Sequence, residues 1–263
     1  MSVIDYCTAG ARVAERALTQ RPRLRHEERL VFVVGCPRSG TTFLGRAIGG
    51  LPGFVDLGEV TPWKAALPSM PLAPELRRIL ERVRLLGLAR GLRGVEQTPE
   101  TAHVLGAALD AYPEALAVHA LRDGRDVVCS LLERGWLNAD RSGTDDAGLT
   151  YGSEPRFWVE PERREEFSQV GDARRCAWAW RRYVEAARAT AAPERVLEVR
   201  YEEFSGEADR LAEFLGANAT STHRALDGFR DSSIGRWQNE LTPEQLAEVE
   251  AEAGGLLREL GYA

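Results

Sequence analysis

Two short stretches of the chain carry residue types that suit the binding of an anion. The first, residues 35–42, reads GCPRSGTT. Gly35 and Gly40 let the backbone curl, so that successive N–H groups can face one anion. The frame is that of a P-loop, but Thr41 stands where nucleotide triphosphatases have a lysine, and a simple turn between a strand and a helix would use the same glycines. The side chains that can assist the backbone are Arg38, Ser39, Thr41 and Thr42.

The second stretch, residues 118–130, reads VHALRDGRDVVCS and passes from an apolar run into a helical pattern. Arg122 falls at the end of the run, and Ser130 lies a turn or two into the predicted helix. Such a pair can clamp a phosphate, the arginine through its planar guanidinium and the serine through its hydroxyl. By itself, the stretch fits a local cluster of surface ion pairs about as well.

Taken together, the two stretches resemble the phosphate-binding motifs of sulfotransferases that use 3′-phosphoadenosine 5′-phosphosulfate (PAPS). The loop of that family reads like residues 37–42, and its arginine form is similar to that of tyrosylprotein sulfotransferases. The resemblance implies that this loop holds the 5′-phosphate and sulfonate without a metal ion, and that Arg122 and Ser130 hold the 3′-phosphate. It implies PAPS as donor and adenosine 3′,5′-bisphosphate (PAP) as product. The loop residues that it assigns to the donor are Arg38, Ser39, Gly40, Thr41 and Thr42.

Two later segments extend the resemblance, which runs from about Leu30 to the C-terminus. The segment 197–204 is similar to the family's strand-end tyrosine segment and assigns Tyr201 to the adenine, although a tyrosine there also suits the core. The segment IGRW at 234–237 resembles the late glycine-rich segment of the family, without its full basic cluster. It assigns Gly235 and Arg236 to the 3′-phosphate.

Sulfonate transfer to a hydroxyl needs a base for the proton and positive charge around the sulfonate. Glu59 resembles the catalytic glutamate of tyrosylprotein sulfotransferases and is predicted to be the base, with Arg38 as the cationic stabiliser. Gln97 occupies the place of the family's lysine and can donate a hydrogen bond but no charge. Lys64 or His103 can substitute for that lysine, or be surface groups. His119, inside a predicted strand, is interpreted as structural.

The pattern of apolar runs predicts one α/β domain with a P-loop-like parallel sheet flanked by helices. Residues 1–29 are predicted to form an N-terminal helix and a basic segment, and residues 30–263 the sulfotransferase-like domain. Within that domain, residues 136–172 have no periodicity and are predicted to be a long polar insertion or lid. The predicted strands are 30–34, 116–121 and 196–199, and the predicted helices are 2–19, 74–92, 102–112, 173–191 and 242–260.

Composition limits the partners of the chain. Its formal net charge of −6 argues against broad nucleic-acid binding, which needs a basic surface. No apolar run suits a signal peptide or a membrane span, which favours a cytoplasmic protein. The four cysteines have no CxxC spacing and are predicted to be reduced and buried. The sequence does not indicate an oligomeric state.

Three functions stay open on the sequence alone. The favoured one is a PAPS-dependent sulfotransferase with a small-molecule or glycoside acceptor. The second is a P-loop kinase or nucleotide hydrolase, which the missing lysine disfavours. The third is a nucleotide-binding protein without turnover, for which Gln97 is the visible sign.

Overall fold

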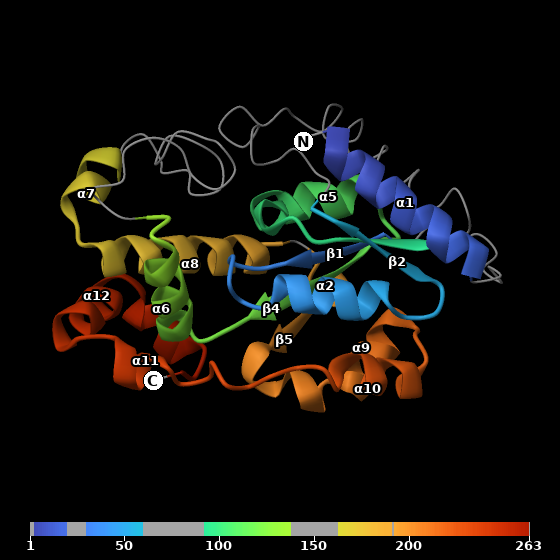
Figure 1. Cartoon of the computed structure of the whole chain (residues 1–263). Helices are drawn as coiled ribbons and strands as arrows, with labels where there is room; N and C mark the ends of the chain where they lie inside the picture. Colours follow the sequence, from blue (N-terminus) through green and yellow to red (C-terminus); the bar gives the residue numbers. More distant parts are fainter. Residues whose placement is uncertain (1–2, 20–29, 60–91, 138–162, 191, 263) are drawn as a thin grey trace.

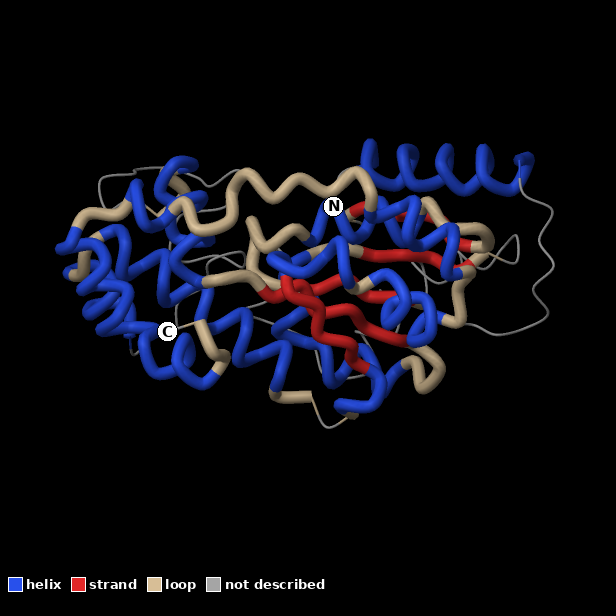
Figure 2. The backbone as a smooth tube through the Cα atoms, turned by 90° about the horizontal axis from the view of Figure 1, so that it is seen from below, coloured by secondary structure: helices blue, strands red, loops and turns tan. Residues whose placement is uncertain are grey.

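Five parallel strands form the centre of the protein. The computed structural model describes residues 3–19, 30–59, 92–137, 163–190 and 192–262. The strand order is β2-β3-β1-β4-β5, and every pair is parallel. Figure 2 shows the strands side by side with helices around them. The strands are β1 (Val31–Val34), β2 (Phe54–Gly58), β3 (Arg93–Glu96), β4 (Leu116–Leu121) and β5 (Val196–Arg200). The predicted α/β class with a parallel sheet is confirmed.

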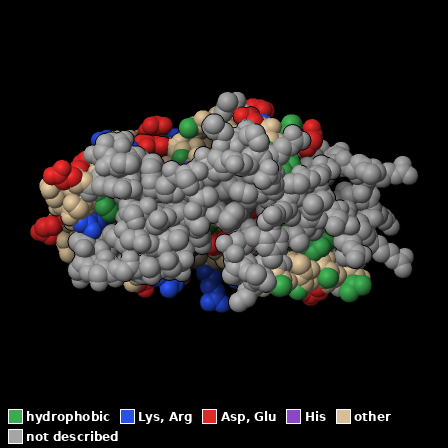
Figure 3. Space-filling view, turned by 90° about the horizontal axis from the view of Figure 1, so that it is seen from above, with side chains coloured by type: hydrophobic (Ala, Val, Ile, Leu, Met, Phe, Trp, Pro, Cys, Tyr) green, Lys and Arg blue, Asp and Glu red, His purple; other side chains and the backbone are tan. Residues whose placement is uncertain are grey.

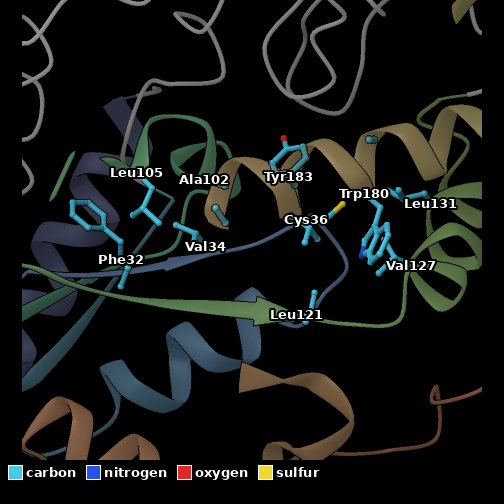
Figure 4. Packing of buried hydrophobic residues seen from close by; sticks show 14 of the residues in the cluster. Phe32, Val34, Cys36, Ala102, Leu105, Leu121, Val127, Leu131, Trp180 and Tyr183 are labelled. Atoms are coloured by element: carbon cyan, nitrogen blue, oxygen red, sulfur yellow. The ribbon is translucent and has the colours of Figure 1, made fainter. Parts of the chain in front are cut away.

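Helices cover both faces of the sheet, which explains why β1 reads as an unbroken apolar run. Val31 and Val33 belong to the core on the face covered by α2, α9 and α10, while Phe32 and Val34 belong to the core on the face of α5 and α8. In Figure 4, Phe32 and Val34 lie on the same side as Ala102 and Leu105. The helices are α1 (Val3–Thr19), α2 (Thr41–Gly49), α5 (Leu105–Ala111), α6 (Gly124–Arg134), α7 (Arg164–Gln169), α8 (Asp172–Arg188), α9 (Ala208–Leu215), α10 (Ala219–Leu226), α11 (Trp237–Glu240) and α12 (Pro243–Glu259).

The strands predicted from apolar runs are confirmed as β1, β4 and β5, but β2 and β3 were missed. The predicted helix 102–112 is wrong at its start, because a 3₁₀ helix (Pro99–Val104) precedes α5. The predicted helix 74–92 lies outside the described residues except for Leu92. The last predicted helix is confirmed as α12, which begins at a capping box between Thr242 and Gln245.

The predicted polar insertion, 136–172, contains regular structure near its end. Residues 164–169 form α7, so the absence of periodicity was misleading there; residues 138–162 lie outside the described part. Figure 3 shows acidic side chains at the end of the molecule where α7 lies, in line with the negative net charge. Cys36, Cys129 and Cys176 are buried and free as predicted, whereas Cys7 is exposed, which corrects the prediction that it is buried. None of the described helices is long and apolar enough to cross a membrane.

Candidate nucleotide and active site

The candidate site residues follow the carboxyl ends of neighbouring strands. Ligands of parallel α/β sheets bind at this edge. Glu59 follows β2, Gln97 follows β3, the loop 35–40 follows β1, Arg122 follows β4 and Tyr201 follows β5. The strand order therefore arranges them along the edge as Glu59, Gln97, loop, Arg122 and Tyr201.

The loop 35–40 curls tightly before α2. Gly35 has φ +148°, and a Cβ there would lie 2.5 Å from the carbonyl oxygen of Ala120. Arg38 is the one non-glycine residue with positive φ in the described part of the chain, at +78°, a conformation that costs energy and is common at functional sites. Gly40, at φ +90°, is the N-cap of α2 and makes no side-chain cap bond. The loop thus leaves the start of α2 open to an anion.

Gly40→Ala is expected to destabilise the protein by roughly 1–3 kcal/mol, because alanine is strained at this φ. The added Cβ would also lie 2.8 Å from the Tyr201 ring and 2.9 Å from the Phe204 ring. Urea unfolding measures the effect. The matched control is Gly255→Ala on α12, where a Cβ meets nothing within 4 Å. Equal unfolding midpoints for the two variants would contradict the strained role of Gly40.

A cavity of about 370 Å³ brings most of the candidate nucleotide residues together. Of the residues assigned from the sequence, those that line it are Arg38, Gly40, Thr41, Thr42, Arg122, Ser130, Tyr201 and Arg236. The lining residues that the sequence analysis missed are Phe43, Gly228, Phe229, Arg230 and Ser233. The two phosphate-binding stretches therefore face one common space.

Arg122 joins the parts of this cavity. It is buried, and its guanidinium donates to the carbonyl oxygens of Arg38 (3.0 Å) and Ser233 (2.6 Å). The guanidinium lies 4.2 Å from the centre of the Tyr201 ring, and the Tyr201 hydroxyl shares a hydrogen bond of 2.9 Å with the Ser233 hydroxyl. Arg122 Nε has no hydrogen-bond partner among the described residues. A buried donor without a partner is a position that a bound anion would satisfy.

The side chain of Arg38 turns toward α6, where its Nε donates to the Ser130 hydroxyl at 2.9 Å. Burial, followed by the positive charges of Arg134, Arg122 and Arg236, lowers the pKa of Arg38 below its ordinary value. These charges repel one another, so a bound anion would relieve the repulsion. Hydrogen bonds and ion pairs with Glu240 and Glu133 raise the pKa of Arg236.

Aromatic rings form one wall of the cavity. The ring of Phe229 lies 4.8 Å from that of Tyr201, edge to face, and 5.5 Å from that of Phe43. Such rings can contact a flat base. Phe229 and Arg230 stand five and four residues before the segment 234–237, and an aromatic residue next to an arginine there was the signal that the sequence offered.

Three residues assigned from the sequence do not line this cavity. Ser39 is buried, and its backbone N–H bonds to the Cys36 carbonyl. Gly235 gives its N–H to Asp126. Glu59 is exposed and follows β2, the edge strand, so that β3 lies between β2 and the strand that leads into the loop. Their assigned roles stay predictions.

The residues considered as substitutes for the missing lysine differ in their surroundings. Gln97 is buried against Gly45 of α2, and its Oε1 has no hydrogen-bond partner in the described part of the protein. Burial, with the nearby charge of Arg182, lowers the pKa of His103 to about 3, and its ring packs against Tyr183. His103 is therefore neutral at neutral pH and supplies no charge. Lys64 lies outside the described residues.

His119 lies within β4, where its Nδ1 is 3.2 Å from a carboxylate oxygen of Glu198, so it is held away from the strand ends.

Glu96, at the end of β3, is fully buried and accepts hydrogen bonds from the backbone and hydroxyl of Thr98 and from the hydroxyl of Thr101. Burial, with a smaller contribution from the charge of Glu59, raises its pKa from 4.5 to about 7. The stability that protonated Glu96 contributes is present below pH 4.5 and is lost as the pH rises through 7.

Glu96→Gln is expected to flatten this dependence and to raise the free energy of unfolding at pH 8 by about 3 kcal/mol, at 1.36 kcal/mol per pKa unit. Urea unfolding at pH 5 and pH 8 measures it, with the exposed Glu213→Gln on α9 as the control. Parallel pH curves for the Glu96 variant and the wild type would contradict the raised pKa.

The fold and the site define a class: a parallel α/β protein with a P-loop-like turn and a second basic strand end facing the same cavity. Its fold is that of the sulfotransferases. The sulfotransferase domain of the curacin biosynthetic pathway superposes with a TM-score of 0.53 at 13% identity, over 87% of this chain and 97% of that domain.

Two further solved structures are similar at lower scores. The sulfotransferase domain of the Synechococcus PCC 7002 olefin synthase has 16% identity and a TM-score of 0.47, with 89% of this chain and 98% of that domain covered. The mouse sulfotransferase SULT7A1, solved with PAP, has 16% identity and a TM-score of 0.45, with 94% and 91% covered. No protein-family model and no curated protein matches the sequence.

Proposed function

We propose that this protein is a PAPS-dependent sulfotransferase that moves a sulfonate group to an acceptor hydroxyl. The observation that carries the proposal is the common cavity, because it unites the loop before α2 with Arg122 and Ser130. These elements are about 85 residues apart in the sequence, and the pairing of β1 with β4 brings them to neighbouring strand ends, where one ligand with two anionic ends can contact both.

The chain's own groups fit the parts of this donor. The open start of α2, with Thr41 and Thr42, binds the 5′ end through N–H and hydroxyl donors. Arg122, whose Nε lacks a partner in the described structure, binds the 3′-phosphate together with Ser130. Tyr201 contacts the adenine, as do the missed rings Phe43 and Phe229.

In the transfer step, Glu59 takes the proton of the acceptor hydroxyl while the acceptor oxygen bonds to sulfur. The bond from sulfur to the 5′-phosphate oxygen breaks, and PAP leaves with the electron pair. Arg38 and the loop N–H groups stabilise the negative charge on the sulfonate and on the leaving phosphate. The strand order supports this division of roles. Glu59 follows a strand on one side of β1 and its loop, whereas Arg122 and Tyr201 follow strands on the other side.

The acceptor that we propose is a small molecule or glycoside of the cytoplasm, bound at the strand ends of β2 and β3. The aromatic residues that we propose for its pocket are Trp63, Trp136, Phe157 and Trp158, of which only Trp136 belongs to the described residues. A nucleotide-binding protein without turnover is the second candidate. It is favoured by the buried, uncharged Gln97, because the sulfotransferase family that the sequence resembles has a lysine at this position.

Titration calorimetry with a chelator present tests the donor. PAP is expected to bind without metal and more tightly than ATP with Mg²⁺; a preference for ATP–Mg²⁺ would instead indicate a kinase or nucleotide hydrolase. Labelled PAPS with panels of phenols and glycosides then tests turnover. PAP binding without transfer to any acceptor would favour the second candidate.

A further inference from the structure

A coil forms part of the cavity wall beside the loop. Residues 228–237, here the strap, run from α10 to the start of α11 and cross the lower part of the molecule in Figure 1. Its residues Phe229, Arg230, Ser233 and Arg236 line the cavity. Ile234, the strap's aliphatic side chain, is 38% exposed, so apolar packing of that residue does not hold the strap in place. Phe229 and Trp237 pack against the cores near the two ends of the strap, so polar contacts restrain the stretch between them.

Asp126, on the first turn of α6, makes two of those contacts. Its Oδ2 accepts the backbone N–H of Gly235 at 2.8 Å, and its Oδ1 accepts the backbone N–H of Trp237 at 3.1 Å. The residue is 1% exposed. Both carboxylate oxygens are thus used, and both partners belong to the strap. The preceding residue of the same turn supports this end of the strap, because the Arg125 guanidinium lies 3.9 Å from the centre of the Trp237 ring.

Asp126 differs from the other groups that touch the strap. Arg122 and Tyr201 bond to Ser233, but both also line the cavity and would contact a nucleotide directly. Asp126 does not line it, and its nearest cation is Arg122, at 4.0 Å. Apart from the effect of its negative charge, Asp126 can therefore act on the ligand only through the strap or through Arg122.

A buried carboxylate beside an anion site is unfavourable unless it has a structural task. Burial raises the pKa of Asp126, against the opposing effect of its two hydrogen bonds and of Arg122. Its negative charge would also repel a phosphate bound at Arg122. The two backbone donors bond to different oxygens of Asp126, and asparagine would set its NH2 group, a donor, against one of these N–H groups.

We infer that Asp126 is a positioning residue that fixes the strap over the cavity and so builds the 3′-phosphate half of the nucleotide site. This inference rests on the proposed function. Because Asp126 acts on the strap and on Arg122, its loss weakens the binding of the 3′-phosphate and leaves the loop that holds the 5′ end unchanged.

The test compares two ligands, PAP and adenosine 5′-monophosphate (AMP), which lacks the 3′-phosphate. In Asp126→Asn, the Kd for PAP is expected to rise about 10- to 100-fold, on the scale of a lost hydrogen bond to a charged group. The Kd for AMP is expected to change by less than about threefold, since AMP lacks the 3′-phosphate and meets the strap only at Phe229, which is six residues before Gly235 and is held by the Tyr201 and Phe43 rings. The control is Asp209→Asn on α9, an exposed aspartate whose partner is His223.

A general loss of structure would weaken PAP and AMP alike, so the ratio of their affinities separates positioning from folding. If wild-type protein binds PAP and Asp126→Asn leaves the ratio of PAP to AMP affinity unchanged, the positioning role of Asp126 is overturned and the proposed function stands. Wild-type protein that does not bind PAP overturns the proposed function and this inference with it. If the variant does not fold, amide exchange on the wild type decides: slow exchange at Gly235 and Trp237 supports the inference, and unprotected exchange at both overturns it.

Discussion

Glu59→Gln is expected to lower the rate of sulfonate transfer by about 100- to 10,000-fold, the usual contribution of a general base. The amide keeps the shape of the side chain and cannot take a proton from the acceptor. PAP affinity is expected to stay unchanged, because Glu59 is exposed beyond β3 and does not line the nucleotide cavity. Steady-state transfer from labelled PAPS and calorimetry with PAP measure the two effects.

The control for this variant is Glu213→Gln, which removes an exposed carboxylate on α9. It separates the loss of a base from the loss of one negative charge on the protein. Glu59→Gln protein that retains most of its transfer rate would remove Glu59 from the role of base. The base would then have to be sought elsewhere along the strand ends.

The parts of the fold that the sequence predicts are those with a local signal. Residues 31–34 and 116–121 are apolar almost throughout, so they were identified as strands, and the segments after them as site elements. β2 and β3 were missed because they contain charged residues and glycine within very short runs. Arg93 is tolerated in β3 because it donates to the carbonyl of Leu215, a contact that no local pattern reveals.

The same distinction holds for the site. Gly40, Arg122 and Ser130 stand at spacings that a motif can recognise, and the structure brings them to one cavity. Phe229, Arg230 and Ser233 were missed because their place depends on the strap, which is held by Asp126 more than 100 residues earlier in the chain. Long-range hydrogen bonds of this kind leave no periodicity in the sequence.

Arg122→Ala is expected to raise the Kd for PAP by about 30- to 3,000-fold, since truncating a buried, hydrogen-bonded charge costs about 2–5 kcal/mol and 1.4 kcal/mol is tenfold. The variant would lose the charge facing the 3′-phosphate and the bonds to the carbonyls of Arg38 and Ser233. Calorimetry with PAP measures the change. Arg210→Ala on α9, an exposed arginine paired with Glu207, is the control.

Arg122→Lys separates charge from geometry at the same position. Lysine keeps the positive charge but concentrates its donors at one point, whereas the guanidinium of Arg122 reaches two carbonyls and leaves Nε for a ligand. We therefore expect the lysine variant to recover only part of the PAP affinity lost in Arg122→Ala. PAP affinity at the wild-type level in Arg122→Ala would mean that the 3′-phosphate is bound elsewhere, and the cavity would no longer explain how the two phosphate-binding stretches act on one ligand.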